Sequence, residues 1–423
     1  MLKKLCSVLL VVILVAIAGQ SVLHAQEPVT IHWLEWWGPE YGEEVMNELT
    51  SRFEAQTGIR VERTTVNWDS MYDLLLTNAQ AGTATYDVLG MEACCFLSGI
   101  DKLGGLEDLT PYLERDPEFA ERLTDLTPVQ WRGGIMELNW YIFPYAYVYN
   151  MDIFEQAGVE PPKNWDEMVE VTRQLNESGV VQYGFGDVFG GFIHHVTYAV
   201  YAGRLAQLGG RMLDENGRAV FNSPEGVAAL ESWKEFMDSG LMLPGAIGMM
   251  ETEAREALAA GTTAAMFDGP FAQVIAEQIN PDIRLAFAPA WRDASSGSGG
   301  YVWAGSGLSI SSNSKHKDEA WEFIKFLLSD EITVWLTEKN NIPYATKAAF
   351  ASIEESDSPI LREIPAMLTQ DPEHNLQLEA LPEQETLHRE FIAMLQEVLA
   401  GNISAQEGLD RVAALWNEVI DAQ

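Results

Sequence analysis

The sequence predicts an α/β protein with room for two folded lobes. Strand-like segments alternate with amphipathic helical segments through most of the chain, which is typical of layered α/β architecture. The 423 residues are enough for two domains, each with a full core. Open α/β sheets bind ligands beyond the carboxyl ends of their strands, so residues that directly follow strands are the first site candidates.

The N-terminal segment 1–25 has the features of a cleavable secretory signal. Lys3 and Lys4 precede an apolar run, and a cut is expected after Ala25. The run is too short for an ordinary membrane-spanning helix, although an uncleaved anchor is the alternative. Cys6 lies too early for a lipid-attachment cysteine. We therefore expect a periplasmic or secreted protein without a lipid anchor.

The composition argues against two classes of partner. A net charge of −37 repels nucleic acid and anionic lipid, so we expect neither to bind. Such acidity suits high salt, but it also serves solubility alone.

After signal cleavage only Cys94 and Cys95 remain, which is no disulfide framework. Either a bond between these neighbours, which an oxidising compartment favours, or two reduced buried thiols fits the sequence.

The first part of the chain is predicted as strands and helices in regular alternation. Apolar residues at helical spacing mark the helices, and glycines end them at Gly58 and Gly82. Ser70 is the expected cap of the second helix. The expected elements are a strand at 29–35, a helix at 39–56, a strand at 59–66, a helix at 70–81, a strand at 86–91 and a turn or helix at 93–103.

The rest of the chain continues this alternation after a polar stretch. Residues 104–139 are acidic and interrupted by prolines, so surface helices and loops are expected. Asn164 and Ser223 are predicted helix caps. The expected strands are 140–150, 180–185, 263–267, 283–289 and 301–310, and the expected helices include 164–178, 223–237, 252–260 and 317–328, with a helical tail over 358–423.

Six segments, in order, resemble extracellular solute-binding proteins of the carbohydrate ABC importer type, such as maltose- and oligosaccharide-binding proteins. These segments are FEAQTGIRVE, TYDVLGME, PYAYVYN, NWDEM, GTTAAMFDGP and SSNSKHKDEAWEFIKFLLSD. The resemblance covers nearly the whole chain after the signal.

The resemblance implies a two-lobe periplasmic-binding-protein fold of the Venus-flytrap kind, with discontinuous lobes and a multi-strand hinge. Ligand would bind in the cleft and the lobes would close over it by a hinge movement. The implied bounds are 26–144 plus 288–327 for lobe 1, 150–283 plus 332–423 for lobe 2, and hinge crossings near 145–149, 284–287 and 328–331. The implied partners are a sugar and the membrane permease, with no bond broken, no cofactor and a monomeric state.

A sugar site needs aromatic platforms and a few well-placed hydrogen-bond partners. Trp36 and Trp37 follow the first strand, and strand alternation indicates that one faces the cleft and the other the core. Glu35, Glu40 and Glu92 could accept sugar hydroxyls, since carboxylates are strong acceptors. Core packing is the alternative for each tryptophan, and a solvated surface acid is the alternative for Glu92.

The crossing strand and a glycine-rich loop supply further candidates. Tyr145 and Tyr147 share one face of a strand and could line the cleft floor or pack in the hinge. Phe189 and His194 lie near the glycine-rich loop. The neighbouring pair His194-His195 is not expected to bind a metal, because adjacent residues on a helix point apart and no cysteine or acid cluster completes a ligand set.

Two strand segments contribute the last candidates. Asp268 and Gly269 end a strand, where backbone amides could bind hydroxyls. Trp303, Gly305 and Ser306 interrupt another strand with small residues, which permits close approach of a ligand.

Three functions compete on this sequence. The first is the sugar-binding component of an ABC importer. The second keeps the fold but binds a polyamine or another cation in a box of aromatics and carboxylates, whose affinity should fall with salt. The third is a secreted polysaccharide hydrolase, although no spacing nominates an acid and a base. Phosphate-binding GxxxxGK[ST], GxSxG and HExxH motifs are absent from the sequence.

Overall fold

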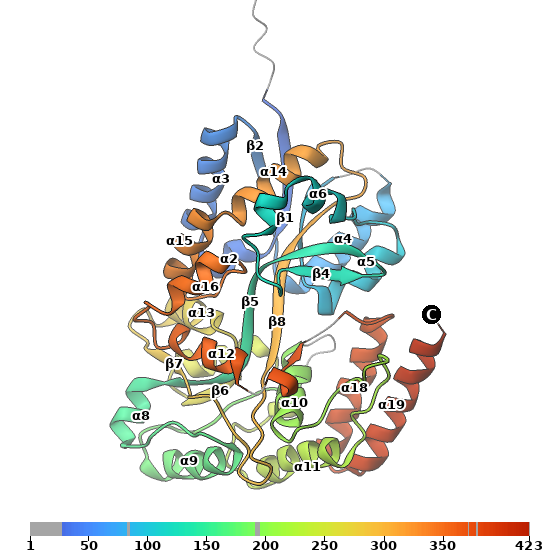
Figure 1. Ribbon diagram of the computed structural model, residues 1–423. Helices are drawn as coiled ribbons and strands as arrows, with labels where there is room; N and C mark the ends of the chain where they lie inside the picture. The colour runs from blue at the N-terminus through green and yellow to red at the C-terminus, as the bar shows by residue number, and fades with distance from the viewer. Residues whose placement is uncertain (1–27, 83–84, 191–194, 371, 378–379, 423) are drawn as a thin grey trace, which may run out of the picture.

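The chain folds into two lobes joined by long strands (Figure 1). The computed structural model describes residues 28–82, 85–190, 195–370, 372–377 and 380–422, so the predicted signal segment lies outside the description. The upper lobe of Figure 1 is built on strands in the order β2-β1-β3-β8-β5-β4, and helices flank both lobes. This arrangement confirms the predicted α/β class. Within these ranges, no helix has the length and apolar character needed to cross a membrane.

Parallel strands organise the first lobe. Strand β1 (Thr30–Glu35) pairs in parallel with β2 (Arg60–Thr65) and with β3 (Val88–Met91). Parallel neighbours need crossover connections, which helices α3 (Glu43–Thr57) and α4 (Trp68–Ala81) supply. Because β1 and β3 end at the same edge, their following residues meet there. Helix α3 buries its apolar face, as its spacing predicted: Val45, Met46, Leu49 and Phe53.

Two helix starts differ from the prediction. The expected helix 39–56 is divided at Gly42, whose φ of 87° no regular helix can accommodate, into α2 (Trp37–Tyr41) and α3. Helix α4 begins at Trp68, two residues before the expected cap Ser70, with Asn67 at the N-cap position. The turn after β1 is thus the start of a short helix.

One strand, β5 (Gly134–Asn150), runs through both lobes. Its first part pairs with β8 (Val302–Ile310) from Leu138 to Tyr145 in the first lobe. From Ala146 onward it pairs instead with two short strands of the second lobe, β6 (Ala265–Asp268) and β7 (Leu285–Phe287). The strand therefore changes partners between Tyr145 and Ala146, at the junction of the lobes.

The polar stretch 104–139 contains more sheet than predicted. It holds the short helices α6 (Thr110–Arg115) and α7 (Pro117–Ala120), but also β4 (Pro128–Trp131) and the start of β5. These two strands form a hairpin whose turn, Arg132-Gly133, has positive φ at both residues. This hairpin lies at the edge of the sheet, since β4 is the last strand in the order.

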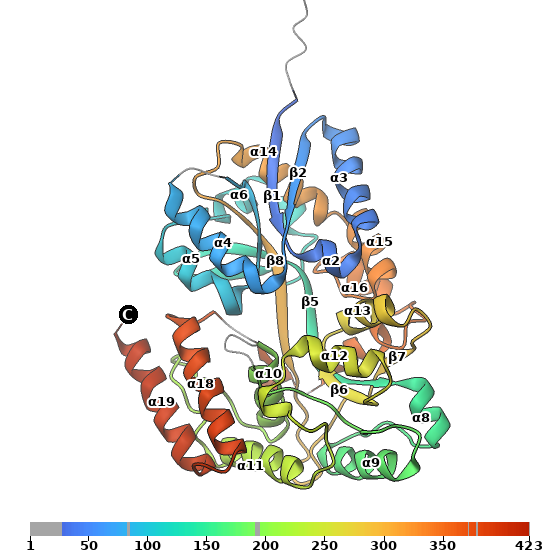
Figure 2. The same ribbon diagram turned by 180° about the vertical axis from the view of Figure 1, so that it is seen from behind.

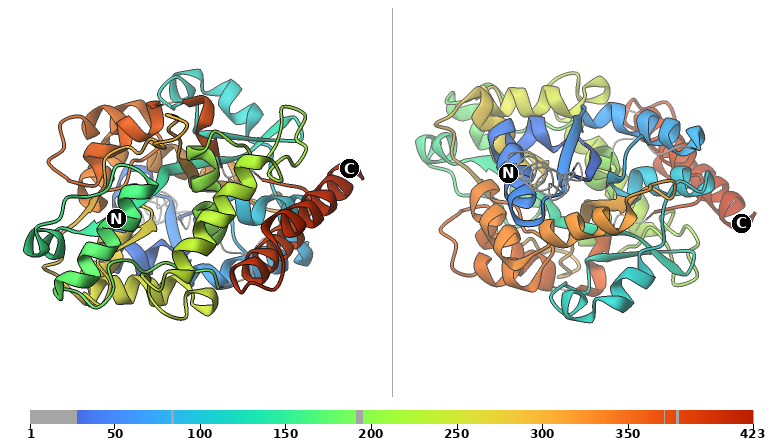
Figure 3. Two further views of the ribbon diagram at one scale, coloured as in Figure 1. Left: turned by 90° about the horizontal axis from the view of Figure 1, so that it is seen from below. Right: turned by 90° about the horizontal axis from the view of Figure 1, so that it is seen from above.

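Helices dominate the second lobe and its far end. The predicted caps Asn164 and Ser223 accept hydrogen bonds from the backbone of Glu167 and Gly226. The expected strand 180–185 is wrong, because this segment makes only isolated bridges. Viewed from behind, α18 and α19 lie beside α11, and from above and below α19 lies at the rim (Figures 2 and 3). The helices are α8 (Met151–Ala157), α9 (Trp165–Ser178), α10 (His195–Gln207), α11 (Pro224–Asp238), α12 (Glu251–Ala259), α13 (Phe271–Ile279), α18 (Gln384–Leu399) and α19 (Ala405–Asp421).

The lobe bounds given above stay a prediction. Helix α14 (Lys317–Leu327) packs against α3 of the first lobe. Helices α15 (Asp330–Asn340) and α16 (Lys347–Ile353) lie beside the same lobe in Figure 1. The backbone of Ala345, between these two helices, donates a 2.8 Å hydrogen bond to Trp140 of β5. The remaining elements of the described residues are η1 (Ala93–Leu97), α5 (Ser98–Lys102), η2 (Ala246–Gly248), η3 (Leu361–Glu363), α17 (Ile364–Thr369), η4 (Pro372–His374) and β9 (Leu376–Gln377).

Candidate functional site

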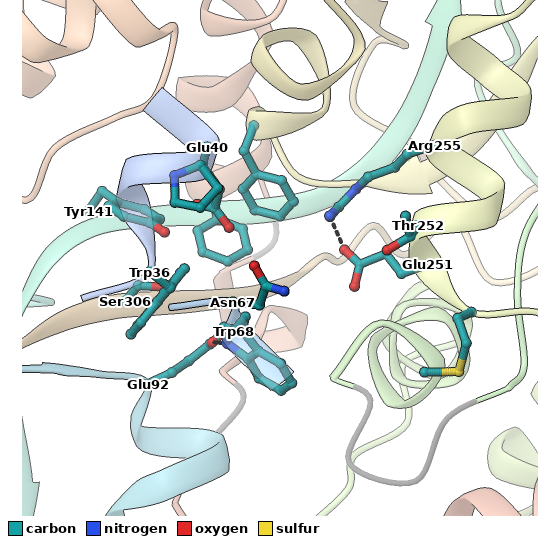
Figure 4. Close-up of a pocket in the computed structure, with 14 residues that line it drawn as sticks. Trp36, Glu40, Asn67, Trp68, Glu92, Tyr141, Glu251, Thr252, Arg255 and Ser306 are labelled. Atoms are coloured by element: carbon teal, nitrogen blue, oxygen red, sulfur yellow. Dashed lines mark hydrogen bonds and ion pairs between the residues drawn. The ribbon is translucent and has the colours of Figure 1, made fainter. Parts of the chain in front are cut away.

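A cavity of about 510 Å³ lies between the lobes, within the size range of small-molecule sites (Figure 4). The first lobe contributes residues that follow β1, β2 and β3, together with residues within β5 and β8. The second lobe contributes the beginning of α12 and of α13. The lining residues are Trp36, Pro39, Glu40, Asn67, Trp68, Glu92, Tyr141, Phe143, Met250, Glu251, Thr252, Arg255, Phe271 and Ser306.

Two indole rings form part of the cavity wall. Trp36 directly follows β1 and lies over Gly90 of β3, where a Cβ atom would come within 2.9 Å of the ring. Trp68 begins α4, and both rings contact Phe96, with centroids 6.1 Å and 5.3 Å away. These contacts hold two flat apolar surfaces at the strand ends, where a sugar ring could lie against either of them.

Two carboxyl groups on the wall have raised pKa values. Glu92 is only 2% exposed, and its Oε2 accepts a 2.6 Å hydrogen bond from Trp68 Nε1. Burial raises its pKa to about 7, although that hydrogen bond opposes the shift. Glu40 is partly exposed where it faces the cavity, but desolvation by the protein around its carboxyl group raises its pKa to about 8. The positive charge of Arg255 opposes this shift and the charge of Glu92 adds to it.

The second lobe places one guanidinium at the cavity. Arg255 donates from Nε and Nη2 to the two carboxylate oxygens of Asp268, at 2.7 Å and 2.9 Å, and also pairs with Glu251. Its guanidinium lies over the Phe271 ring, with Cζ 4.7 Å from the ring centroid. Asp268 is fully buried and also accepts the amide of Gly269. Asp268 and Gly269 therefore lie behind Arg255, and Asp268 orients it.

Glu35 and Trp37 lie behind the wall and support it. Glu35 is fully buried, accepts the amide of Gly38 at 2.8 Å and pairs with Arg63 at 2.9 Å. Trp37 is fully buried, and its Nε1 donates a 3.0 Å hydrogen bond to the hydroxyl of Tyr141. Trp36 thus faces the cavity while Trp37 faces the core.

Four further candidates pack away from the cavity. Tyr145 and Tyr147 are 5% and 1% exposed and pack in the hinge, one of the two readings open for them. Phe189 is buried against Trp233, with centroids 5.4 Å apart. Trp303 packs with Ile142 in a separate small apolar cluster. His194 lies outside the described residues.

Gly305 and Ser306 are neighbours on β8, but only Ser306 lines the cavity. A Cβ atom at Gly305 would come within 2.3 Å of Asn139 Oδ1, so its small size lets β8 pass β5. Ser306, the next residue, lies on the cavity wall. Of the residues predicted from the sequence, the structure thus brings Trp36, Glu40, Glu92 and Ser306 together around one cavity.

Some wall residues absent from the sequence prediction also lie at the ends of strands. Asn67 and Trp68 follow the second strand just as Trp36 follows the first, so the same rule could have found them. Arg255 lies within a helix of the other lobe, and no local pattern marks it. Tyr141 and Phe143 lie on β5, the strand that also holds the predicted residues Tyr145 and Tyr147.

Two contacts join residues of the first lobe to residues of the second lobe. Gln278 of α13 donates a 2.8 Å hydrogen bond to the carbonyl of Pro39 in α2. Lys102 of α5 lies 2.5 Å from Glu383, the residue before α18. Both contacts join residues far apart in the sequence, so they help hold the two lobes against each other.

Comparisons with known proteins identify the family. The model of the family "Bacterial extracellular solute-binding protein" matches residues 38–334. A binding protein of Brucella abortus (strain 2308) is 29% identical, with 67% of this chain and 68% of that protein covered. The arabinooligosaccharide-binding protein of Bacillus subtilis (strain 168) is 25% identical, with 64% of this chain and 63% of that protein covered.

Solved structures share the architecture. A Thermotoga lettingae solute-binding protein of an ABC transporter, bound with α-D-tagatose, superposes with a TM-score of 0.81 at 25% identity, covering 93% of this chain and 100% of that one. The maltose-bound MalE3 of T. maritima superposes with a TM-score of 0.78 at 22% identity, covering 92% and 99%. This likeness confirms the predicted two-lobe fold. The chain belongs to the bacterial extracellular solute-binding proteins, a family of binding proteins and not of enzymes.

Proposed function

We propose that this protein is the substrate-binding component of an ABC importer, which captures a mono- or oligosaccharide between its lobes and delivers it to the membrane permease. The observation that carries the proposal is the interlobe cavity, whose wall combines indole rings with hydrogen-bonding side chains. Sugar-binding relatives support it, since the tagatose-bound and arabinooligosaccharide-binding proteins share its fold or sequence. Export through segment 1–25 and action as a monomer belong to the same proposal.

Five of the wall residues have a definite role in this proposal. Trp36 and Trp68 provide apolar surfaces for the faces of sugar rings. The Glu40 carboxyl forms hydrogen bonds with sugar hydroxyls, donating when it is protonated and accepting through its oxygens, and the Ser306 hydroxyl both donates and accepts. Arg255, held by Asp268, donates from the second lobe. Because ligand would contact both lobes at once, binding favours their closed arrangement.

A cationic ligand is the second candidate. Three carboxyl groups on the wall favour it: Glu40, Glu92 and Glu251. Arg255 opposes it, because a guanidinium on the same wall repels a polyamine. The affinity for a cation should fall steeply with ionic strength, whereas the affinity for a neutral sugar should change little.

Tryptophan fluorescence titration tests both candidates. We expect saturable binding of a neutral saccharide from a panel of mono- and oligosaccharides, and no tighter binding of spermidine. Trp36→Ala should weaken binding about tenfold or more, because truncation of a central tryptophan removes a large share of the contact energy. Trp335→Ala is the control, since Trp335 lies on α15 and stacks with Arg52, away from the cavity. Failure of every saccharide to bind the folded protein, or equal losses in both variants, would contradict the proposal.

A further inference from the structure

A compact group of soft and hard ligand atoms lies directly behind the cavity wall. Strand β3 ends at Met91, and the chain then enters the π-helical turn η1. Glu92, Cys94 and Cys95 each offer one ligand atom here, and these atoms all lie within 4.8 Å of one another. The two sulfur atoms are 3.3 Å apart, and each of the three residues is at most 2% exposed.

A fourth residue of this region, Glu137 of β5, lacks any compensation for its burial. It is fully buried, and neither carboxylate oxygen has a hydrogen-bond partner among the residues that the structure describes. Its Oε1 lies where a side chain on Gly307 would be, 2.7 Å from the position of a Cβ atom. Gly307 pairs with Met91, the residue before Glu92. An ionised carboxylate in such a place is costly unless a positive charge neutralises it.

We propose that Glu92, Cys94 and Cys95 bind a divalent cation of the zinc class, and that the charge of Glu137 stabilises the bound cation. Two thiolates and a carboxylate are ligands of Zn²⁺, whereas hard cations such as Mg²⁺ prefer oxygen ligands alone. Each thiol releases its proton to solvent when its sulfur binds the metal, so binding is a simple exchange of protons for the cation. No oxidant or reductant takes part.

The geometry needs only small adjustments. Metal–ligand bonds of about 2.0–2.3 Å place tetrahedral ligand atoms roughly 3.3–3.8 Å apart. The sulfur atoms at 3.3 Å are already close to this separation. Trp68 Nε1 donates to Oε2 of Glu92, which leaves Oε1 for the metal and fixes the carboxylate, as outer hydrogen bonds do at metal sites. Because Glu92 also lines the cavity, the cation has a route from solvent through the cleft.

Cobalt titration of the reduced, chelator-treated mature chain tests this proposal. Co²⁺ bound by thiolates gives sulfur-to-metal charge-transfer absorption, and we expect one equivalent per chain, displaced by Zn²⁺ but not by excess Mg²⁺. Cys94→Ser and Cys95→Ser should each remove the charge-transfer band. Glu137→Gln should weaken affinity about tenfold or more. Asp187→Asn is the matched control, because Asp187 is a fully buried carboxyl of the other lobe and its amide should leave affinity unchanged.

The wild-type chain decides the question even if a variant fails to fold. Three outcomes would overturn the proposal. The first is absence of the band in the reduced wild-type chain, and the second is its retention in both serine variants. The third is displacement of cobalt by Mg²⁺, which would mean an adventitious ion only. Oxidation of Cys94 and Cys95 to a disulfide should abolish cobalt binding, and reduction should restore it. Sugar titration of the metal-free chain reads the proposed function separately, so either proposal can fail alone.

Discussion

Substitution of Gly90 by alanine should weaken ligand binding through a single contact. Gly90 lies in β3, and an alanine Cβ there would come within 2.9 Å of Trp36 Cζ3 and 3.2 Å of the Leu34 carbonyl oxygen. Ordinary carbon contacts are about 3.5–4.0 Å, so the indole must move by roughly 0.6 Å or more, because the backbone cannot. The ring that forms the cavity wall would therefore be displaced.

Displacement of the Trp36 ring should weaken its contact with the ligand and also strain the core. A shift of 0.5–1 Å forfeits about a quarter to a half of a dispersion contact. If the Trp36 platform contributes about 2 kcal/mol to binding, the loss is about 0.5–1 kcal/mol, or two- to fivefold in Kd. Crowding of the core should also lower the free energy of unfolding by about 1–3 kcal/mol.

Fluorescence titration with the bound saccharide, together with urea unfolding, measures both quantities. The matched control is Gly203→Ala in α10, where a Cβ atom would meet nothing within 4 Å. That variant should bind as wild type does and unfold no more easily, since alanine is the better helix former. Unchanged affinity in Gly90→Ala, or an equal loss in Gly203→Ala, would refute the reasoning.

Two further predictions concern charge. The pKa of Glu40 is raised to about 8 in the folded protein from an ordinary 4.5, so its contribution to stability is complete below about pH 4.5 and is lost as pH rises through 8. Glu40→Gln should therefore reduce the fall in unfolding free energy between pH 6 and pH 9, measured by urea unfolding, and an unchanged slope would count against this pKa. Arg63→Ala should destabilise the protein by about 3–5 kcal/mol in the same assay, because it removes the positive charge that is paired with the fully buried carboxylate of Glu35. The control Arg60→Ala removes an exposed pair and should cost less than about 1 kcal/mol, and equal losses would show that Glu35 has other compensation.

Local patterns account for the parts of the fold that were predicted. The faces of α3 and the caps of α9 and α11 depend on residues a few positions apart, so the sequence contains them directly. The break at Gly42 depends on one dihedral angle, and glycine permits such an angle without requiring it. The segment 180–185 has strand composition but finds no continuous partner in the fold, and pairing is a property of the whole structure.

Site residues that directly follow strands could be predicted from the sequence. Site residues that reach the cavity only because the two lobes pack together could not. Trp36 and Glu92 follow β1 and β3, so topology alone nominates them. Arg255 reaches the cavity only because α12 faces the first lobe, a relation of tertiary structure. Glu137 lies in a polar stretch that indicated surface, and only the neighbouring strands show that it is buried.

The exchange of partners along β5 has a mechanical consequence. Since this one uninterrupted strand is hydrogen-bonded to a different sheet on each side of the Tyr145–Ala146 peptide, any swing of one half of the molecule must appear as torsion in a few consecutive backbone units. A continuous hydrogen-bonded strand restricts the relative movement of two lobes more than a flexible linker would. Opening and closing should therefore twist the same few residues, and the amides at this junction should register each cycle in hydrogen exchange.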